Sequence, residues 1–447
     1  MKRLIYIILI ALCANCSPLL EQPKVEMPQS YLFGEEFSQD SCTVGLRWWE
    51  LFGDTTLNNV IEYALLNNRN LASALANVET ARNYIGVAKA EFLPSIYLNA
   101  EVEAYRINGV ETKEYSATPT MEWEISLFGK LRNSRSSAIE EYLSSQWGYR
   151  AAVLSLSTEV ATTLFTLNMY ERSLDIARRS YTLRREATAL IDSMHKYGMS
   201  DAIALEQARS LVYSAKSEMS KYQRAVEQTT IALNLLLGDA TPSVSYTLRN
   251  ATLPPDIPIG IPSQLIERRP DVWESYFQML SAASKVGVAR ADRFPSISLT
   301  ADGGFVTETL KDLSSAKPFG WSLLGELTQP IFNFGALKRK EKMAYQTYIS
   351  AMFSYEESTL SALSDVERAL SAITTYRDQL LESKSLVVAN SKIGHSTSAL
   401  YKSGLGDYLS VIDAERELYT SQIDFSQYLT QQYLNYVDLV KALGGGY

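Results

Sequence analysis

The chain has 447 residues, 46% of them apolar, and a formal net charge of −8, so it can bury a large core and has no basic excess that would favour nucleic acid. Its 2 histidines stand in no metal-ligand spacing, and no phosphate-binding glycine-lysine loop is present; both observations argue against an enzyme, a metal site or a cofactor. Beyond the N-terminus no segment approaches roughly 18 consecutive apolar residues, so strands would have to make any membrane crossing.

The N-terminus predicts export and a lipid anchor. A basic start is followed by the uncharged residues 4–12, an apolar run too short to span a bilayer. The run ends near Cys13 and Cys16, and a cysteine in this place is where bacterial lipoproteins are cleaved and acylated. We expect a signal peptide over 1–15 and a segment lipidated on Cys16 over 16–47, the alternative being an ordinary signal peptide with incidental cysteines. The remaining Cys42 then has no partner for a disulfide.

The chain carries an internal duplication. The motif GVAKAEFLPSI at 86–96 returns as GVARADRFPSI at 287–297, an offset of 201 residues, and a second set of matches, from Phe128 and Phe334 onward, has a constant offset of 206. We predict a first repeat over 48–238 and a second over 263–447, joined by a proline-rich linker over 239–262.

Each repeat predicts a long helical hairpin. Apolar residues step by three and four from Ile139 to Ala177, and again from Tyr345 to Leu380, which is a heptad seam. Helices over 131–194 and 337–400, some 64 residues each, would be roughly 96 Å long. Each ends at a glycine, and a second helix returns over 201–238 or 407–443. Shorter helices over 57–90 and 263–291 precede the strands.

Between these helices the apolar period changes to two, which predicts strands over about 94–127 and 295–330. In the first pair, Ile96, Leu98 and Val102 alternate with polar residues, and a polar loop precedes the next strand near Ala117. One-faced strands of about ten residues are typical of transmembrane β-barrels, the alternative being the edge of a soluble sandwich. Four strands per chain cannot close a barrel, so several chains must share one; three chains give 12 strands and a lumen.

Several motifs, by their order and spacing, make the chain resemble the outer-membrane efflux proteins of the TolC and OprM type, specifically the lipoprotein branch that serves RND pumps. They are WWELFGD at 48–54, WEISLFGKLR at 123–132, RRPD at 268–271, QPIF at 329–332 and KALGGG at 441–446. The resemblance covers nearly all of the chain after about residue 47. It implies a mainly α, TolC-like tandem repeat with four transmembrane strands per protomer, a trimeric 12-stranded barrel and a helical tunnel. Such a duct is passive, with no cofactor except the covalent lipid on Cys16.

The resemblance also implies partners and a docking site. A homotrimer in the lipid of the bacterial outer membrane, lipid-anchored and with a long periplasmic extension, would dock on a periplasmic adaptor and through it on an inner-membrane RND transporter. The residues at the helical tips would face the adaptor: Tyr197, Gly198, Met199, Ser200, Gly404, Leu405 and Gly406. A chain reversal by itself also favours glycine, and Asp201 and Asp407 fit N-caps of the returning helices better than contact residues.

A gate at the periplasmic entrance is the last site that the resemblance implies. The family closes this entrance with a ring of aspartates, and Asp413 stands at the matching position, while Ser410 replaces a second aspartate found in other members. Three carboxylates near an axis would favour cations and respond to pH. The alternative is that Asp413 is an ordinary solvated residue near Arg416 or Lys402.

Two other functions share parts of this pattern. The outer-membrane duct of a type I protein secretion system would have the same architecture, and only the lipoprotein signal and the motif details favour efflux of drugs or other toxicants. A structural coiled-coil envelope lipoprotein is the second alternative, but it would not need two one-faced β-hairpins. The sequence does not identify the cargo.

Overall fold

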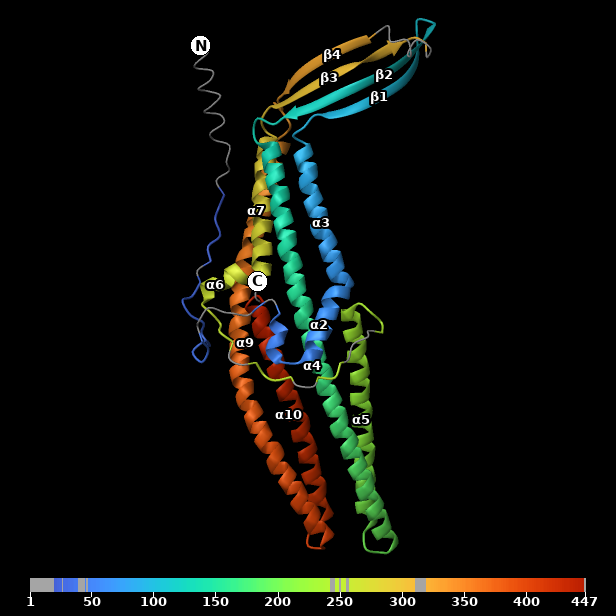
Figure 1. Ribbon diagram of the computed structural model, residues 1–447, viewed down its shortest axis with the longest axis vertical. Helices are drawn as coiled ribbons and strands as arrows, with labels where there is room; N and C mark the ends of the chain where they lie inside the picture. Colours follow the sequence, from blue (N-terminus) through green and yellow to red (C-terminus); the bar gives the residue numbers. More distant parts are fainter. Residues whose placement is uncertain are drawn as a thin grey trace. The chain divides into compact units, whose positions relative to one another are not determined.

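The computed structural model describes residues 20–25, 27–38, 45, 47–241, 246–248, 251–254, 257–309 and 319–445 (Figure 1). The chain divides into two compact units: unit 1 combines residues 1–25, 75–148 and 271–358, and unit 2 combines 26–74, 149–270 and 359–447. Each unit therefore draws on both sequence repeats.

Unit 1 contains a four-stranded antiparallel sheet in the order β1-β2-β3-β4. The strands are β1 (Ser95–Ile107), β2 (Val110–Ile125), β3 (Ser296–Thr307) and β4 (Phe319–Thr328). The pairing of β2 with β3 joins the two repeats and sets Met121 opposite Ala301. Within the described residues the outer edges of β1 and β4 have no partner strand.

The first hairpin corrects one sequence prediction. The polar loop expected before Ala117 is instead strand, and β1 and β2 are joined by the two residues Asn108 and Gly109, with φ of 52° and 85°. Two adjacent positive φ values are what a tight turn between right-twisted strands needs, and asparagine followed by glycine meets that need at low steric cost. The sheet is therefore longer in this hairpin than hydrophobic alternation alone suggested.

The sheet has one apolar face that the described residues leave uncovered. Ile96 and Leu98 on β1 are each 73% exposed, and Trp321 on β4 is 75% exposed. Their neighbours along the strands, such as Glu101 and Ser322, point to the opposite face because side chains alternate along a strand. Such a large exposed apolar surface calls for lipid or protein to cover it.

The long helices form two pairs: α4 (Lys130–Lys196) with α5 (Ala202–Leu237), and α9 (Ala336–Lys402) with α10 (Tyr408–Ala442). α4 and α9 begin in unit 1 and continue into unit 2, whereas α5 and α10 belong to unit 2 alone. α4 and α9 have 67 residues each, close to the predicted 64. None of the helices in the described ranges combines the length and the hydropathy that crossing a bilayer requires.

The helices that precede the strands are each broken in two. The single helix expected over 57–90 is α2 (Thr55–Asn67) and α3 (Arg69–Ala90), because Asn68 adopts an extended conformation and its Oδ1 caps α3 by accepting from the amide of Leu71 at 2.9 Å. The helix expected over 263–291 is α6 (Pro262–Arg268) and α7 (Pro270–Ala291). There the break follows from Pro270, which disfavours helix in the residue before it.

The core of unit 2 surrounds the short 3₁₀ helix η1 (Trp48–Phe52). Phe52 is fully buried, and Phe165 stacks on Tyr433 beside it at 4.8 Å. The chain end packs into the same unit: the amide of Gly445 donates to the carbonyl of Val440 at 3.0 Å, which closes α10. Gly444 and Gly445, both with positive φ, thus form the terminus of the helix.

The core of unit 1 lies between α7 and α9. Met279, Ala282 and Val286 on α7 pack against Tyr348 and Met352 on α9, all of them buried. The seam predicted on the second long helix is therefore the contact face of α9 in this unit.

Candidate functional site at the helical tips

The two hairpin tips in unit 2 share one backbone design. At the first tip the amide of Met199 donates to the carbonyl of Met194 at 2.9 Å, and at the second the amide of Leu405 donates to Leu400 at 2.9 Å. Gly198 and Gly404 precede these donors with φ of 72° and 76°. This is the usual way to close a helix with a left-handed glycine, so both glycines are required by the turn itself.

The aspartates that follow the tips are N-caps, as predicted. Asp201 Oδ1 accepts from the amide of Ala204 at 2.6 Å, and Asp407 Oδ1 accepts from the amide of Ser410 at 2.7 Å. The hydrogen bond from Ser410 holds the pKa of the Asp407 carboxyl below its usual range. Both carboxylates serve the fold, which leaves the apolar tip residues as the candidates for contact.

The apolar tip side chains project into solvent. Tyr197 is 80% exposed, Met199 66% and Leu405 79%. Gly406 differs from the other glycines, because a Cβ placed there would lie 3.2 Å from the Cβ of Leu400, so its role is close packing inside the turn. The structure thus places the predicted contact residues at two adjacent turns and exposes three large apolar side chains there.

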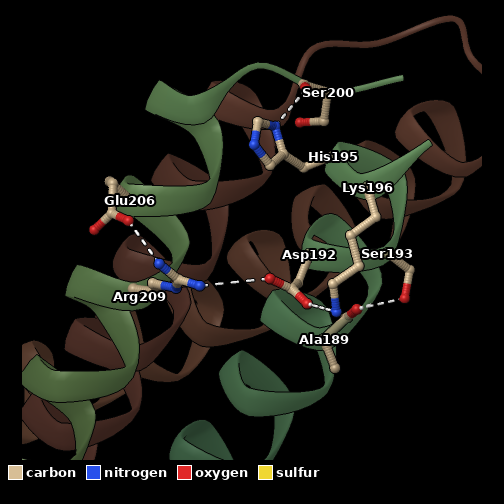
Figure 2. A network of polar contacts seen from close by, with 8 residues as sticks. All are labelled: Ala189, Asp192, Ser193, His195, Lys196, Ser200, Glu206 and Arg209. Carbon is tan, nitrogen blue, oxygen red and sulfur yellow. Dashed lines mark hydrogen bonds and ion pairs between the residues drawn. The ribbon is translucent and has the colours of Figure 1, made fainter. Parts of the chain in front are cut away.

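A polar network that the sequence did not reveal joins α4 to α5 next to the first tip (Figure 2). The carboxylate of Asp192 lies 2.6 Å from Lys196 Nζ and 3.4 Å from Arg209 Nη2, and Arg209 also contacts Glu206 at 2.7 Å. Lys196 is the first cause of a lowered pKa at Asp192. The spacing of four residues between Asp192 and Lys196 was visible in the sequence, but the partner on α5 was not.

The two tips are also joined to each other. Ile191, Leu205 and Ala208 form a buried cluster on the first hairpin, and Tyr408 of the second packs against it. Burial raises the pKa of Tyr408 to about 12. The hydroxyl of Tyr401 donates to Met194 Sδ at 3.8 Å. The two tips therefore form one composite surface on each chain.

One buried cation lies farther from the tips in the same unit. Arg184 on α4 is 8% exposed and sits 5.8 Å from the ring centre of Tyr419 on α10. Burial raises the pKa of the nearby Glu415 carboxyl, and the charge of Arg184 opposes that rise. This inter-hairpin contact was also missed, because the partners lie on helices that are distant in sequence.

The predicted gate residue Asp413 lies on α10, two turns past the second tip. Its side chain is 60% exposed, and Oδ1 lies 3.7 Å from Arg416 Nη1, one of the two cations anticipated for it. Ser410 is exposed and belongs to the first turn of α10, where its amide is used by the cap. In the single chain Asp413 is therefore a solvated side chain beside Arg416.

Two further predictions concern covalent and metal chemistry. Cys16, the predicted lipidation site, lies outside the described residues, as does Cys42. In the part of the chain that the structure describes, no group of three or more histidine, cysteine, aspartate or glutamate side chains is arranged to hold a metal ion.

Comparison with known proteins identifies the family. Residues 60–239 and 261–445 match the family described as outer membrane efflux protein. The solvent efflux pump outer membrane protein SrpC of Pseudomonas putida is 31% identical over 98% of this chain and 97% of its own length. The probable outer membrane lipoprotein SilC of Salmonella typhimurium is 30% identical over 99% and 97%.

A solved structure supports the same assignment at the level of fold. The outer membrane channel CmeC of Campylobacter jejuni is similar with a TM-score of 0.91 at 24% identity, covering 97% of this chain and 95% of that chain. Since the family match spans both repeats and the relatives match along almost their whole length, the protein belongs to the outer membrane efflux protein family and is a TolC-like exit duct of the bacterial outer membrane.

Proposed function

We propose that three copies of the chain close a 12-stranded barrel and a helical tunnel, and that this homotrimer is the exit duct of a tripartite RND-type pump for drugs or other toxicants. The observation that carries the proposal is a match between the two repeats in unit 1. One surface of each repeat packs against the other repeat inside the chain, and the equivalent surface of the opposite repeat is exposed. A passive duct of this kind needs no catalytic group and no cofactor.

Inside unit 1 the first repeat packs against the second. Phe128 stacks on Phe294 with ring centres 4.9 Å apart, the hydroxyls of Ser137 and Ser281 lie 3.0 Å apart, and β2 pairs with β3. These contacts join the strand end and the helix start of one repeat to the other repeat.

The corresponding surfaces at the outer edges are uncovered. Phe334, the counterpart of Phe128, is 85% exposed, and Leu93, the counterpart of Phe294, is 67% exposed. The outer edges of β4 and β1 likewise have no partner among the described strands. A second copy that repeats the internal contact would cover both surfaces. Because the two surfaces differ, the contact is head-to-tail and must close into a ring.

Strand number sets the size of the ring. Two copies would give eight strands, whose interior side chains fill, whereas three give 12 strands and leave a lumen. A closed barrel is also the one arrangement that leaves no unpaired strand edge in lipid.

The internal register predicts the contact between chains. Inside the chain Met121 lies opposite Ala301. Their counterparts in the other repeat are Leu327 and Ala100, so Leu327 of one copy should lie opposite Ala100 of the next. In a Cys42→Ser background, Leu327→Cys combined with Ala100→Cys should give disulfide-linked trimers on oxidation, because residues directly opposite in a sheet have Cβ atoms about 5 Å apart. Denaturing electrophoresis measures the products.

The control pairs Leu327→Cys with Asn99→Cys, whose side chain points to the other face of the sheet. Monomers from the matched pair, or equal cross-linking by both pairs, would refute the proposed barrel.

The tips are proposed to bind the periplasmic adaptor, with Tyr197, Met199 and Leu405 as the apolar contacts. Leu405→Asp should raise the sensitivity of the bacterium to exported toxicants to that of a deletion strain without lowering the yield of trimer. Lys384→Asp, a charge change on α9 away from the tips, should change neither the sensitivity to toxicants nor the yield of trimer. Full resistance with Leu405→Asp would remove this residue from the contact.

The anchor and the cargo are further parts of the proposal. The relative SilC is named a probable outer membrane lipoprotein, which supports acylation at Cys16, and SrpC is named a solvent efflux pump protein, which favours small toxicants over secreted proteins. Incorporation of labelled palmitate should be lost in Cys16→Ala, and persistence of the label would place the lipid elsewhere. The division of the chain into signal peptide, lipidated segment, two repeats and linker stands as part of the same proposal.

A further inference from the structure

An open groove of about 550 Å³ lies in unit 1 between the end of α7 and the start of α9. Four cationic side chains line it: Arg290, Arg293, Lys338 and Lys342. The one carboxylate in the lining, Glu341, is paired with Arg293. The groove therefore carries an excess of positive charge.

The two lysines form no ion pair with the described residues, since Glu341 is paired with Arg293. In the described ranges, no carboxylate lies within the 4.0 Å ion-pair distance of Lys338 or Lys342. Both side chains are exposed and stand one helical turn apart in the first turns of α9, where the helix dipole already favours an anion. Unpaired cations beside one another repel, so a bound anion would relieve that repulsion.

The chain that leaves the apolar face of the sheet is bonded to a residue of the groove. Gln329, directly after β4, donates from Nε2 to the carbonyl of Arg293 at 3.2 Å. Leu327 lies on the apolar face of β4 and is 67% exposed, and Ile331, four residues after it, is 93% exposed. Two exposed apolar side chains thus flank the residue that is hydrogen-bonded to the basic groove.

The first repeat has the same arrangement at the strand end. Trp123 Nε1 donates to the carbonyl of Phe92 at 3.0 Å. Trp123 and Phe92 are the counterparts of Gln329 and Arg293 in the first repeat. A tryptophan with one apolar and one hydrogen-bonding edge is the residue preferred at the boundary between lipid and water. This position therefore fits the level where the sheet leaves the membrane.

The first described residues of the chain, Leu20 and Glu21, contact the buried cluster beside the same groove. Leu20 packs against the cluster of Met279 and Tyr348, which continues through Val286 into the groove lining, and the hydroxyl of Tyr348 donates to the carbonyl of Glu21. The residues before Leu20 include the proposed acylation site at Cys16. The described residues nearest in sequence to the proposed acylation site thus pack against the cluster that borders the groove.

We propose that this groove binds the phosphate headgroup of an anionic phospholipid from the leaflet that faces the periplasm, with the acyl chains along Leu327 and Ile331. Lys338 and Lys342 contact the phosphate, and Arg290 and Arg293 add to the positive field. A free phosphate ion would use the cations but not Leu327 and Ile331. The inference rests on the proposed function, because the strands must cross the membrane for this level to meet the headgroups.

Native mass spectrometry of the detergent-solubilised full-length protein tests the site. The protein is offered equimolar phosphatidylglycerol and phosphatidylcholine with identical acyl chains, and the bound lipids are counted. The wild type should prefer phosphatidylglycerol, and Lys338→Gln with Lys342→Gln should reduce that preference by about fivefold for each lysine removed. Lys384→Gln with Lys392→Gln, two exposed lysines farther along α9, should leave it unchanged.

Three results would overturn the site: no preference in the wild type, an unchanged preference in the Lys338 and Lys342 double variant, or displacement of phosphatidylglycerol by an equal concentration of inorganic phosphate. The same spectra report the mass of the assembly. A trimer without lipid preference refutes the lipid site alone, whereas the absence of a trimer refutes the proposed function.

Discussion

Gly238 fixes the end of the long helix α5. Its φ is 70°, and a Cβ at this position would lie 2.4 Å from the carbonyl oxygen of Asn67, a backbone atom that cannot move aside cheaply. Its amide closes the helix by donating to the carbonyl of Leu235 at 3.1 Å. Both the backbone conformation and the close approach therefore require glycine.

We predict that Gly238→Ala lowers the free energy of unfolding by about 1–3 kcal/mol, because it combines a left-handed backbone with a backbone clash. Gly394→Ala is the matched control: Gly394 lies inside α9, where the new Cβ would make only an ordinary contact, 3.8 Å from Leu418 Cδ2, and the substitution should stabilise the protein by up to about 1 kcal/mol. Thermal unfolding of the purified proteins measures both changes. Equal effects from the two substitutions would contradict the account of Gly238.

At the scale of single residues, the sequence could predict the helix caps and the turn glycines. The caps at Asp201 and Asp407 follow from the residue type before a helix, and the tip glycines follow from the reversal. The ion pair of Asp192 with Arg209 and the contact of Arg184 with the ring of Tyr419 depend on which helices lie side by side. Sequence spacing on one helix contains no information about that choice.

At the scale of elements, the lengths of α4 and α9 were predictable because an uninterrupted heptad seam has no stop signal inside it. The break between α2 and α3 was not, since Asn68 is neither proline nor glycine and ends the helix by turning its own side chain into a cap. The turn at Asn108 and Gly109 was not predicted, although asparagine followed by glycine is a strong hairpin signal. The polar residues on both sides of the turn interrupt the alternation of apolar and polar side chains that marks the strands.

The start of α10 should respond to acid through its cap. The pKa of Asp407 is lowered by the amide of Ser410, so the stabilisation is present above the ordinary carboxyl pKa of about 4 and is lost as pH falls through the lowered value. The protection factors of the amides of residues 408–412, which correct for the pH dependence of intrinsic exchange, should therefore fall in acid. Asp407→Ala should exchange fast at every pH.

Asp407→Asn supplies the control for the cap. An asparagine oxygen can still accept from the Ser410 amide but does not titrate in this range, so its protection should be independent of pH. Protection factors that fall in acid to the same extent in Asp407→Asn would show that another group is responsible.

At the scale of the whole molecule, the sequence predicted that a single chain is incomplete, because four one-faced strands leave two edges in lipid. It could not predict which surfaces meet. The structure narrows that choice through the internal contact of Phe128 with Phe294 and the exposed counterparts Phe334 and Leu93. The role of Asp413 also belongs to this scale, since a side chain 60% exposed on one chain can line an axis only in the assembly.

We propose that the assembly is a conducting duct and that a ring of three Asp413 side chains narrows its entrance. Single-channel recording of the purified protein in planar bilayers tests it most directly. The wild type should give small, cation-selective current steps, and Asp413→Ala should give larger steps with weaker cation selectivity, because three converging carboxylates are removed. Absence of any current in both proteins would contradict the account.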